Sequence, residues 1–251
     1  MNPARYVLVF ANDGDQTASR FVLRHAREGV RLVTPRDLSR PGWRYEVRQG
    51  AVSAQALVGN ETVPQERLAG VLTRLGCVTA MDIPHIQAGD RDYVAAEMQA
   101  FLVAWLHTLP CPVVNRPSAI CLAGNWWSPQ KWVQIASRLG IPVSPLEQRI
   151  VGHATRRRSP SASRVEAVTA VTVVGRRVVG TVAPRLADQA RMLARAVGLE
   201  FVTVHFSSPA EDAPFVGATP WPDLAEVAIG DAVLRHLRCA PRAIPMGCAT
   251  A

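Results

Sequence analysis

A helical run joined to a short strand with very little slack, at residues 90–117, constrains the fold of this chain most. The segment reads DRDYVAAEMQAFLVAWLHTLPCPVVNRP. Over residues 93–106 its apolar side chains recur at the three- and four-residue spacing of a helix with one buried face. Asp92 is a candidate N-cap, and two prolines stop the helix before residues 113–114, which predict a short buried strand.

The N-terminal half alternates between strand-type and helix-type runs. Because short, continuously apolar strands separated by helices are typical of parallel sheets, residues 1 to about 120 predict an open, mainly parallel sheet. Strands are expected at residues 6–11, 30–33, 68–74 and 113–114, helices at 17–27 and 93–106, and an edge pair at 44–47 and 56–58.

The C-terminal half has a different texture and predicts a smaller α+β lobe. Two β-branched runs separated by a Gly-Arg turn indicate a hairpin. The hairpin is expected at residues 168–174 and 177–182, followed by a helix at 186–197, strands at 201–206 and 214–217, and a helix at 223–237. A further helix is expected at 128–139, with a proline at its first position and a glycine at its end.

These patterns predict four segments in a chain of 251 residues, which is long enough for a substantial core. We expect an α/β domain at residues 1–145, a basic linker at 146–164, a C-terminal lobe at 165–240 and a disordered tail at 241–251.

Charge and composition narrow the classes of partner. The chain carries a net charge of +8, and Lys131 is its only lysine. The densest basic cluster, Arg156, Arg157 and Arg158, is predicted to be a solvated loop. Nucleic-acid binding through it has weak support, because aromatic residues do not interleave with the arginines.

Neither a membrane span nor a metal or disulfide framework is expected. The sequence contains no apolar run of about 18 residues and no signal-peptide pattern at its start, so a cytoplasmic protein is expected. Five cysteines without a CxxC pair, and six histidines without ligand spacing, predict no zinc or iron site.

In the order and texture of these elements the chain resembles the ATP-grasp superfamily, in particular the RimK-like (ribosomal-S6-modification-like) carboxylate-amine ligases. The segments that carry the resemblance are LAGVLTRLG, residues 90–117, the helix before GIPVSP, VTAVTVVGRRVVG, ARAVGLEFVTVHF and PFVGATPWP. The resemblance implies a pre-ATP-grasp-like N-terminal domain, a C-terminal ATP-grasp lobe, and ATP held between two lobes with magnesium.

The chain departs from that family pattern in two ways. Only 19 residues separate positions 145 and 165, where a central lobe would need about 60 at ordinary element lengths. At the family's functional positions in the second lobe stand residues that cannot supply the expected arginine and hard carboxylate oxygens. These positions are Ala170, His205, Gly217 and Thr219.

Candidate ligand-binding residues follow the predicted strand ends. Arg74 ends one strand, and Asn115 with Arg116 ends another, so they could converge on an anionic group such as a carboxylate. The alternative is that they cap helices or pair with nearby aspartates, namely Asp82 and Asp90. Lys131 is a weaker candidate, and no catalytic residue and no metal ligand is predicted.

The main hypothesis from the sequence is a catalytically degenerate ATP-grasp-like protein. It would act as an accessory or scaffold subunit without a cofactor, binding a small anionic metabolite or a protein partner, or forming a homodimer over the surface left by the absent lobe. The alternative is an ATP-dependent carboxylate-amine ligase of cofactor, amino-acid or peptide-tailoring biosynthesis. In that case ATP and magnesium would be held in a rearranged or partner-supplied site.

Overall fold

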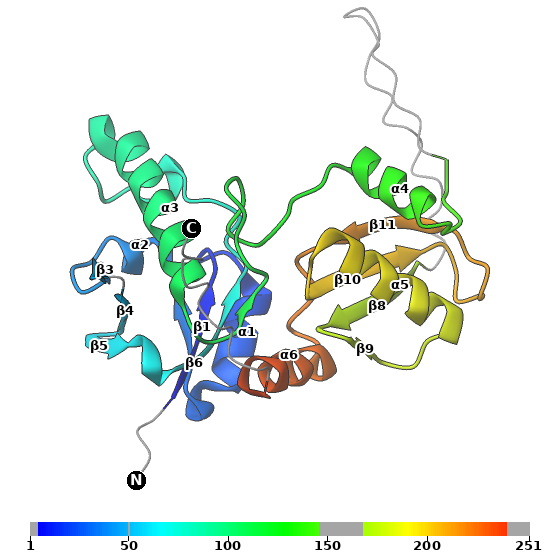
Figure 1. The fold of residues 1–251 in the computed structure, drawn as a ribbon, viewed down its shortest axis with the longest axis horizontal. Helices are drawn as coiled ribbons and strands as arrows, with labels where there is room; N and C mark the ends of the chain where they lie inside the picture. Colours follow the sequence, from blue (N-terminus) through cyan, green and yellow to red (C-terminus); the bar gives the residue numbers. More distant parts are fainter. Residues whose placement is uncertain (1–4, 50, 146–167, 240–251) are drawn as a thin grey trace, which may run out of the picture. The chain divides into compact units, whose positions relative to one another are not determined.

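The computed structural model describes residues 5–49, 51–145 and 168–239, which form two compact units. Unit 1 comprises Met1–Trp126 and Asp223–Ala251, and unit 2 comprises Trp127–Pro222. Figure 1 shows the elements of each unit and their labels. The predicted loop at residues 156–158, the linker at 146–164 and the tail at 241–251 lie wholly or almost wholly outside the described residues.

Unit 1 is built on a parallel sheet, as the sequence predicted, and its strands have the order β2-β1-β6-β7. All three pairings are parallel. Strand β1 lies between β2 and β6, and Val9 of β1 is opposite Leu72 of β6. The strands are β1 (Tyr6–Phe10), β2 (Val30–Val33), β6 (Leu68–Thr73) and β7 (Val113–Val114).

A second, antiparallel sheet of unit 1 has the order β3-β4-β5. Its strands are β3 (Arg44–Arg48), β4 (Ala51–Val58) and β5 (Glu61–Pro64). The predicted edge pair was wrong in its partners: Arg44 lies opposite Gln55, whereas residues 56–58 pair with β5. The reason is that β4 has eight residues, enough to serve both neighbours in turn.

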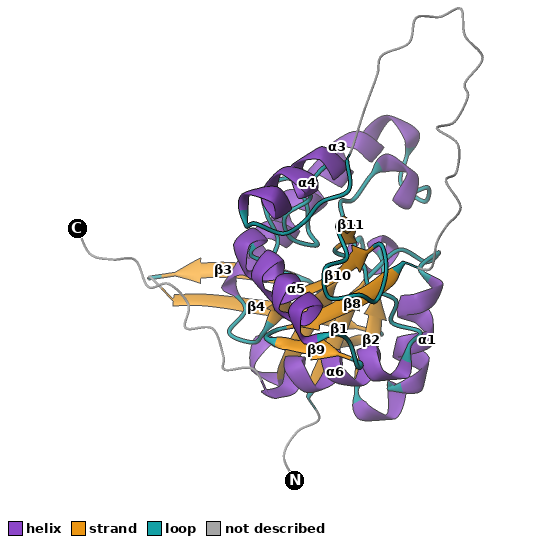
Figure 2. Cartoon of the chain, turned by 90° about the vertical axis from the view of Figure 1, so that its right-hand side faces the viewer, coloured by secondary structure: helices purple, strands orange, loops and turns teal. Residues whose placement is uncertain are grey.

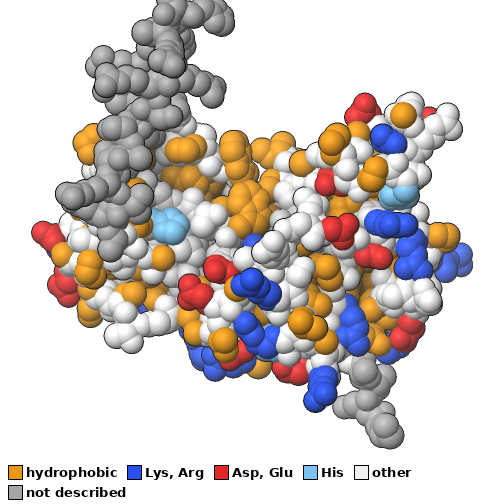
Figure 3. All heavy atoms as spheres, turned by 180° about the vertical axis from the view of Figure 1, so that it is seen from behind, with side chains coloured by type: hydrophobic (Ala, Val, Ile, Leu, Met, Phe, Trp, Pro, Cys, Tyr) orange, Lys and Arg blue, Asp and Glu red, His pale blue; other side chains and the backbone are white. Residues whose placement is uncertain are grey.

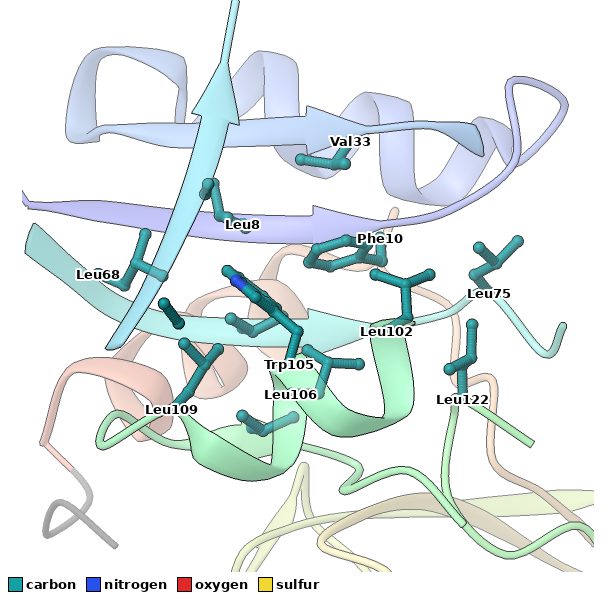
Figure 4. Close-up of a cluster of buried hydrophobic side chains, with 14 of the residues drawn as sticks. Leu8, Phe10, Val33, Leu68, Leu75, Leu102, Trp105, Leu106, Leu109 and Leu122 are labelled. Atoms are coloured by element: carbon teal, nitrogen blue, oxygen red, sulfur yellow. The ribbon is translucent and has the colours of Figure 1, made fainter. Parts of the chain in front are cut away.

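The core of unit 1 lies between the parallel sheet and the long helix α3 (Arg91–Thr108). Trp105 and Leu102 of α3 are fully buried against Leu8, Phe10 and Leu68 of the sheet, as Figure 4 shows. The Trp105 indole donates a hydrogen bond to the Gln55 carbonyl at 3.2 Å, which also ties α3 to the antiparallel sheet. The apolar spacing at residues 93–106 therefore marks the main core helix, as predicted.

Two helices pack on the other side of the parallel sheet: α1 (Gln16–Arg24) and the C-terminal helix α6 (Val227–Cys239). Gly70 of β6 permits the approach of α6, because a Cβ at this position would lie 2.9 Å from both the Cβ and the carbonyl oxygen of Leu237. Arg24 donates to the Ala225 carbonyl at 2.8 Å, and Arg238 pairs with Glu28 at 2.7 Å. The last helix thus belongs to unit 1, whereas the sequence placed it in the C-terminal lobe.

Unit 2 is an antiparallel sheet in the order β11-β10-β8-β9, with two helices. Figure 2 distinguishes its strands from its helices by colour. Helix α4 lies in this unit, although the sequence assigned it to the N-terminal domain. The elements are α4 (Pro129–Arg138), β8 (Thr169–Val174), β9 (Arg177–Val179), α5 (Pro184–Val197), β10 (Phe201–Phe206) and β11 (Phe215–Thr219).

Shorter helical turns complete the described chain. The short helix α2 (Pro35–Leu38) begins at a capping box between Thr34 and Asp37. The 3-10 turns are η1 (Ala26–Glu28), η2 (Gln65–Arg67), η3 (Ala80–Asp82) and η4 (Ala88–Asp90). None of the described helices is both long and apolar enough to cross a membrane.

Candidate functional site

The carboxyl ends of β1, β6 and β7 bring three predicted residues to one edge of the parallel sheet. The Arg74 amide donates to the Phe10 carbonyl at 2.8 Å, so Arg74 directly follows β6 beside the end of β1. The Thr73 hydroxyl donates to the Asn115 carbonyl at 2.6 Å, which joins the ends of β6 and β7. Arg116 follows with an exposed side chain. The ends of β6 and β7 therefore lie side by side, as the sequence predicted.

Arg74 is engaged by residues of α1. Its side chain is only 6% exposed, and its Nε donates to the Asp15 carboxylate at 2.6 Å. A second guanidinium nitrogen donates to the Thr17 hydroxyl at 2.9 Å. The Asp15 carboxylate also accepts from the Ala18 amide at 3.0 Å, so it caps α1 while it binds Arg74. The ion pair that the sequence allowed for therefore forms, but with Asp15; Asp82 instead accepts from Thr79.

The electrostatics of Asp15 reflect this arrangement. Burial raises the pKa of the Asp15 carboxyl, but hydrogen bonds from Arg74 and the Ala18 amide, and the positive charge of Arg74, outweigh burial. The net result is a pKa below the ordinary value. Asp15 is therefore ionised at neutral pH and holds the guanidinium in place. The geometry gives Arg74 a clear role in positioning α1 on the sheet.

Lys131 lies in unit 2, near the start of α4. The Ser128 hydroxyl caps this helix by accepting from the Lys131 amide, and a proline occupies the first helical position. The Lys131 ammonium donates to the Gln134 side chain at 3.1 Å and lies 5.9 Å from the centroid of the Trp127 ring. These contacts fit an ordinary surface lysine, and a ligand role for it stays a prediction.

The four residues that the sequence comparison singled out as departures from the family pattern lie together on the sheet of unit 2. His205 of β10 lies directly opposite Ala170 of β8 and Gly217 of β11, and Thr203 lies opposite Thr219. Because directly opposed residues of an antiparallel pair point to the same face, these side chains share one face. The sequence could not show this, since it depends on the strand register. We call this surface the threonine face; it comprises Ala170, Thr172, Thr203, His205, Gly217 and Thr219.

The residues between them point to the opposite face, which is the core of unit 2. Val171, Val173, Val202 and Val204 are fully buried in one cluster with the apolar side of α5. The apolar residues of α5 in this cluster recur at three- and four-residue spacing. The alternation therefore leaves the threonine face as the side of the sheet that does not carry α5.

The threonine face is neutral and partly hydroxylic. The hydroxyls of Thr172 and Thr203 are 2.7 Å apart and hydrogen-bonded across the strands, and both residues are 5% exposed. Burial lowers the pKa of His205, so its imidazole is uncharged at neutral pH. Trp221 donates its amide to the Thr219 hydroxyl at 3.2 Å. This face can accept and donate neutral hydrogen bonds.

The residues on the threonine face do not fit a magnesium nucleotide. Magnesium prefers hard carboxylate oxygens in octahedral geometry, whereas this face offers hydroxyls and one imidazole. Across the described ranges, moreover, no group of three or more His, Cys, Asp or Glu side chains is placed to hold a metal. No step of a phosphoryl transfer can therefore be assigned to these side chains.

The face of the molecule that Figure 3 shows carries both positive and negative side chains. On the face shown in Figure 3, basic and acidic side chains are interspersed with hydrophobic ones. Several of the arginines pair with neighbouring carboxylates; examples are Arg44 and Arg48 with Glu46, and Arg191 with Asp188. The net charge of +8 is thus not gathered into a single basic patch on this face.

Comparison with known proteins identifies the fold. No family model and no curated protein matches the sequence. Among solved structures, a Chryseobacterium gregarium RiPP-associated ATP-grasp ligase, in complex with ADP and a leader and core peptide, superposes with a TM-score of 0.65 at 11% identity. The alignment covers 95% of this chain and 98% of that chain.

Two further structures agree. The macrocyclase MdnB from Microcystis aeruginosa MRC has a TM-score of 0.59 at 17% identity, with 94% of this chain and 100% of that chain covered. The ATP-grasp ligase PsnB, complexed with a minimal precursor, Mg and ADP, has a TM-score of 0.58 at 14% identity, with 92% and 98% covered. The chain therefore shares the fold of these ATP-grasp ligases, as the order and texture of its sequence elements predicted.

Proposed function

We propose that this chain is the peptide-holding component of an ATP-dependent carboxylate-amine ligase, in which a partner chain supplies the groups that bind the phosphates and magnesium. The proposal follows the alternative hypothesis from the sequence and takes peptide tailoring as the pathway class. It gives the partner a specific task, because a ligase must place cations and metal ions on the transferred phosphoryl group.

The observation that supports this proposal is the end-to-end match to ligases solved with ADP and peptides. Both units of the chain align, and 98% of the Chryseobacterium gregarium ligase is spanned. The macrocyclase MdnC, which was solved bound to its precursor peptide MdnA, is spanned to the same extent with a TM-score of 0.57. A chain that retains the frame of peptide ligases is expected to retain a peptide as its partner.

The need for a partner rests on the threonine face. Ala170, His205 and Gly217 form one row across three strands, and none of them provides a carboxylate. Phosphoryl transfer to a carboxylate, which gives an acyl phosphate, needs the charge on the transferred group to be neutralised. In the proposed assembly the partner brings acidic and basic side chains, while this chain contributes the sheet surface and its hydroxyls.

The test measures nucleotide binding and condensation separately. Isothermal titration with ATP and Mg²⁺ is expected to show no binding to the isolated chain and saturable binding to its complex with a partner encoded beside it. Incubation of that complex with a candidate precursor peptide is expected to convert one ATP to ADP and phosphate for each bond formed, with one oxygen of the peptide carboxylate leaving on the phosphate. The peptide mass is expected to fall by one water per bond, as measured by mass spectrometry.

Variants show whether the threonine face takes part. His205→Ala is expected to lower the condensation rate of the complex, whereas Val216→Ala, at an exposed position of β11, is expected to leave it unchanged. Turnover by the isolated chain would place the ATP site within it and refute the partner requirement. Failure of every neighbouring partner to support condensation would refute the ligase role.

The second candidate is the non-catalytic binding protein that was the main hypothesis from the sequence. The neutral row of Ala170, His205 and Gly217 favours it, because a binding protein has no need of metal ligands there. This candidate predicts a stable complex with a partner or peptide, with no ADP release under any condition. The same two measurements therefore separate the two candidates.

A further inference from the structure

Strand β3 ends the antiparallel sheet of unit 1 with one free edge. In the order β3-β4-β5 it pairs with β4 alone among the described strands. Figure 2 shows β3 and β4 side by side at the periphery of the cartoon. An edge strand presents unpaired N–H and C=O groups that can template another strand. The five residues of β3 set the length of the segment that could pair there.

A groove opens where β3 begins, between the preceding loop and α3. Its volume is about 340 Å³, and its walls are formed by Trp43, Met98 and Phe101, with Arg40 and Glu97 among the polar side chains that line it. A mainly apolar pocket with a few polar groups is typical of a ligand site, and this volume lies at the small end of the range of about 300 to 1,000 Å³ for such sites, with room for a bulky side chain.

Trp43 fixes the shape of the groove. Its indole donates to the Asp37 carbonyl at 3.0 Å, and its ring lies 5.4 Å from Trp105 and 6.0 Å from Phe10, both in the core. The wall at Trp43 is therefore a rigid extension of the hydrophobic core. A preformed pocket costs little to occupy, because its side chains are already ordered.

The groove continues into an apolar stripe along β3. Tyr45 and Val47 follow Trp43 at alternate positions, so the strand period places them on the same face. They are 38% and 57% exposed, and Val52, directly opposite Val47 on β4, is 39% exposed. An added strand would place every second side chain against this stripe and one end residue in the groove.

The charges around the edge favour an acidic partner. Strand β3 carries two arginines, Arg44 and Arg48, against one acidic residue, Glu46, whereas Arg40 in the preceding loop pairs with Asp37 at 3.8 Å. Arg44 and Arg48 share Glu46 as their carboxylate partner, so the edge carries an excess of positive charge. A strand with carboxylates at the positions between its apolar residues would complement this excess.

We propose that the β3 edge and its groove form a docking site for an extended peptide segment with alternating apolar and acidic residues and a bulky apolar anchor at one end. The segment pairs its main chain with β3 and inserts its anchor between Trp43 and α3. The identification of this segment as part of the peptide substrate rests on the proposed function; the docking chemistry does not.

The test uses two labelled probes, the acetylated and amidated hexapeptides Trp-Glu-Val-Glu-Val-Glu and its reverse, because the strand direction is not fixed by the edge. Fluorescence anisotropy with the full chain is expected to show saturable binding of one of them. N-methylation at alternate peptide nitrogens is expected to weaken binding about tenfold, since it removes main-chain donors worth about 1.4 kcal/mol. Unchanged binding of the methylated probe would overturn the strand pairing.

Variants of the groove locate the anchor. Phe101→Ala is expected to weaken binding about tenfold through lost apolar burial. Tyr93→Ala, on the same helix and 70% exposed outside the groove, is the matched control and is expected to bind normally. Arg40→Glu, an exposed change that keeps the apolar walls, is expected to weaken binding, whereas Arg36→Glu in α2 is not. If Phe101→Ala and Arg40→Glu both bound the probe as tightly as the wild type does, the proposed site would be refuted.

Sedimentation velocity separates the peptide from a second copy of this chain as the occupant. A dimer that is lost in Phe101→Ala but not in Tyr93→Ala would assign the edge to self-association and overturn the peptide proposal. Failure of the proposed function looks different: peptide binding at the groove would persist while the complex with a partner neither bound ATP nor condensed the peptide.

Discussion

Replacing Arg74 by methionine tests whether its guanidinium is structural. The side chain is 6% exposed and its partner Asp15 is 18% exposed, so the change leaves a largely buried carboxylate without its charge partner. Loss of one member of a buried pair typically costs about 3 to 5 kcal/mol, and the residual exposure of Asp15 places the expected loss near the lower end, at about 3 kcal/mol. For a chain of this size, that corresponds to a fall in melting temperature of about 6 to 12 °C.

Asp15→Asn separates charge from capping. Asparagine caps a helix about as well as aspartate, so this variant keeps the hydrogen bond to the Ala18 amide and removes only the charge. Urea unfolding of the wild type, both single variants and the double variant gives a coupling free energy, which we expect to be about 1 to 3 kcal/mol. Circular dichroism and tryptophan fluorescence should be followed together, because the two units can unfold separately.

The pH dependence of this pair has a definite sign. The pKa of Asp15 is lower in the folded chain than its ordinary value, so the unfolded chain binds the proton more readily. The stabilisation is therefore complete at neutral pH and is lost as the pH falls below about 5 toward the folded pKa. The stability difference between wild type and Asp15→Asn should shrink over that range. If Arg74→Met unfolds within about 0.5 kcal/mol of wild type at pH 7, the structural role of the guanidinium is refuted.

Three further predictions concern the last helix and the threonine face. Gly70→Ala should lower the free energy of unfolding by about 1 to 3 kcal/mol in urea titrations, because the new Cβ meets the backbone of α6 at Leu237; an unchanged midpoint would contradict the close packing. A chain ending at residue 222 should lose the cooperative unfolding of unit 1, measured by circular dichroism, since α6 covers β6; retained cooperativity would show that α6 is dispensable. His205→Gln should flatten the stability profile between about pH 7 and 5, because the lowered pKa of His205 makes the wild type less stable as acid protonates the unfolded state first; parallel profiles would refute its burial.

The elements that depend on local patterns could be predicted from the sequence. Helix α3 was predicted by its apolar spacing, α4 by the proline at its first position and the glycine at its end, and the β8–β9 hairpin by its β-branched runs and glycine turn. Each of these signals acts over a few residues. Helix α3 begins two residues before and ends two residues after the range predicted from its apolar spacing, which is the usual uncertainty of helix ends.

The features that depend on contacts between distant segments could not be predicted in the same way. The partner of Arg74, Asp15, lies 59 residues away at the start of α1, and this pairing can be inferred only once β1 and β6 are known to be neighbours. The return of α6 to unit 1 leaves one local trace, a glycine within the apolar strand β6. A glycine in a strand indicates close approach of another backbone, but it does not say which one approaches.

The strand register also changes what the unusual residues mean. Taken singly, Ala170, His205, Gly217 and Thr219 could each reflect drift at an unimportant position. Ala170, His205 and Gly217 form one row, and Thr219 adjoins it opposite Thr203. A row without ionised side chains carries no uncompensated charge, which would be costly to bury. The hydroxyls of Thr172 and Thr203 are already buried within the chain, so only the neutral remainder of this face, at Ala170, His205, Gly217 and Thr219, is open to the partner that we propose.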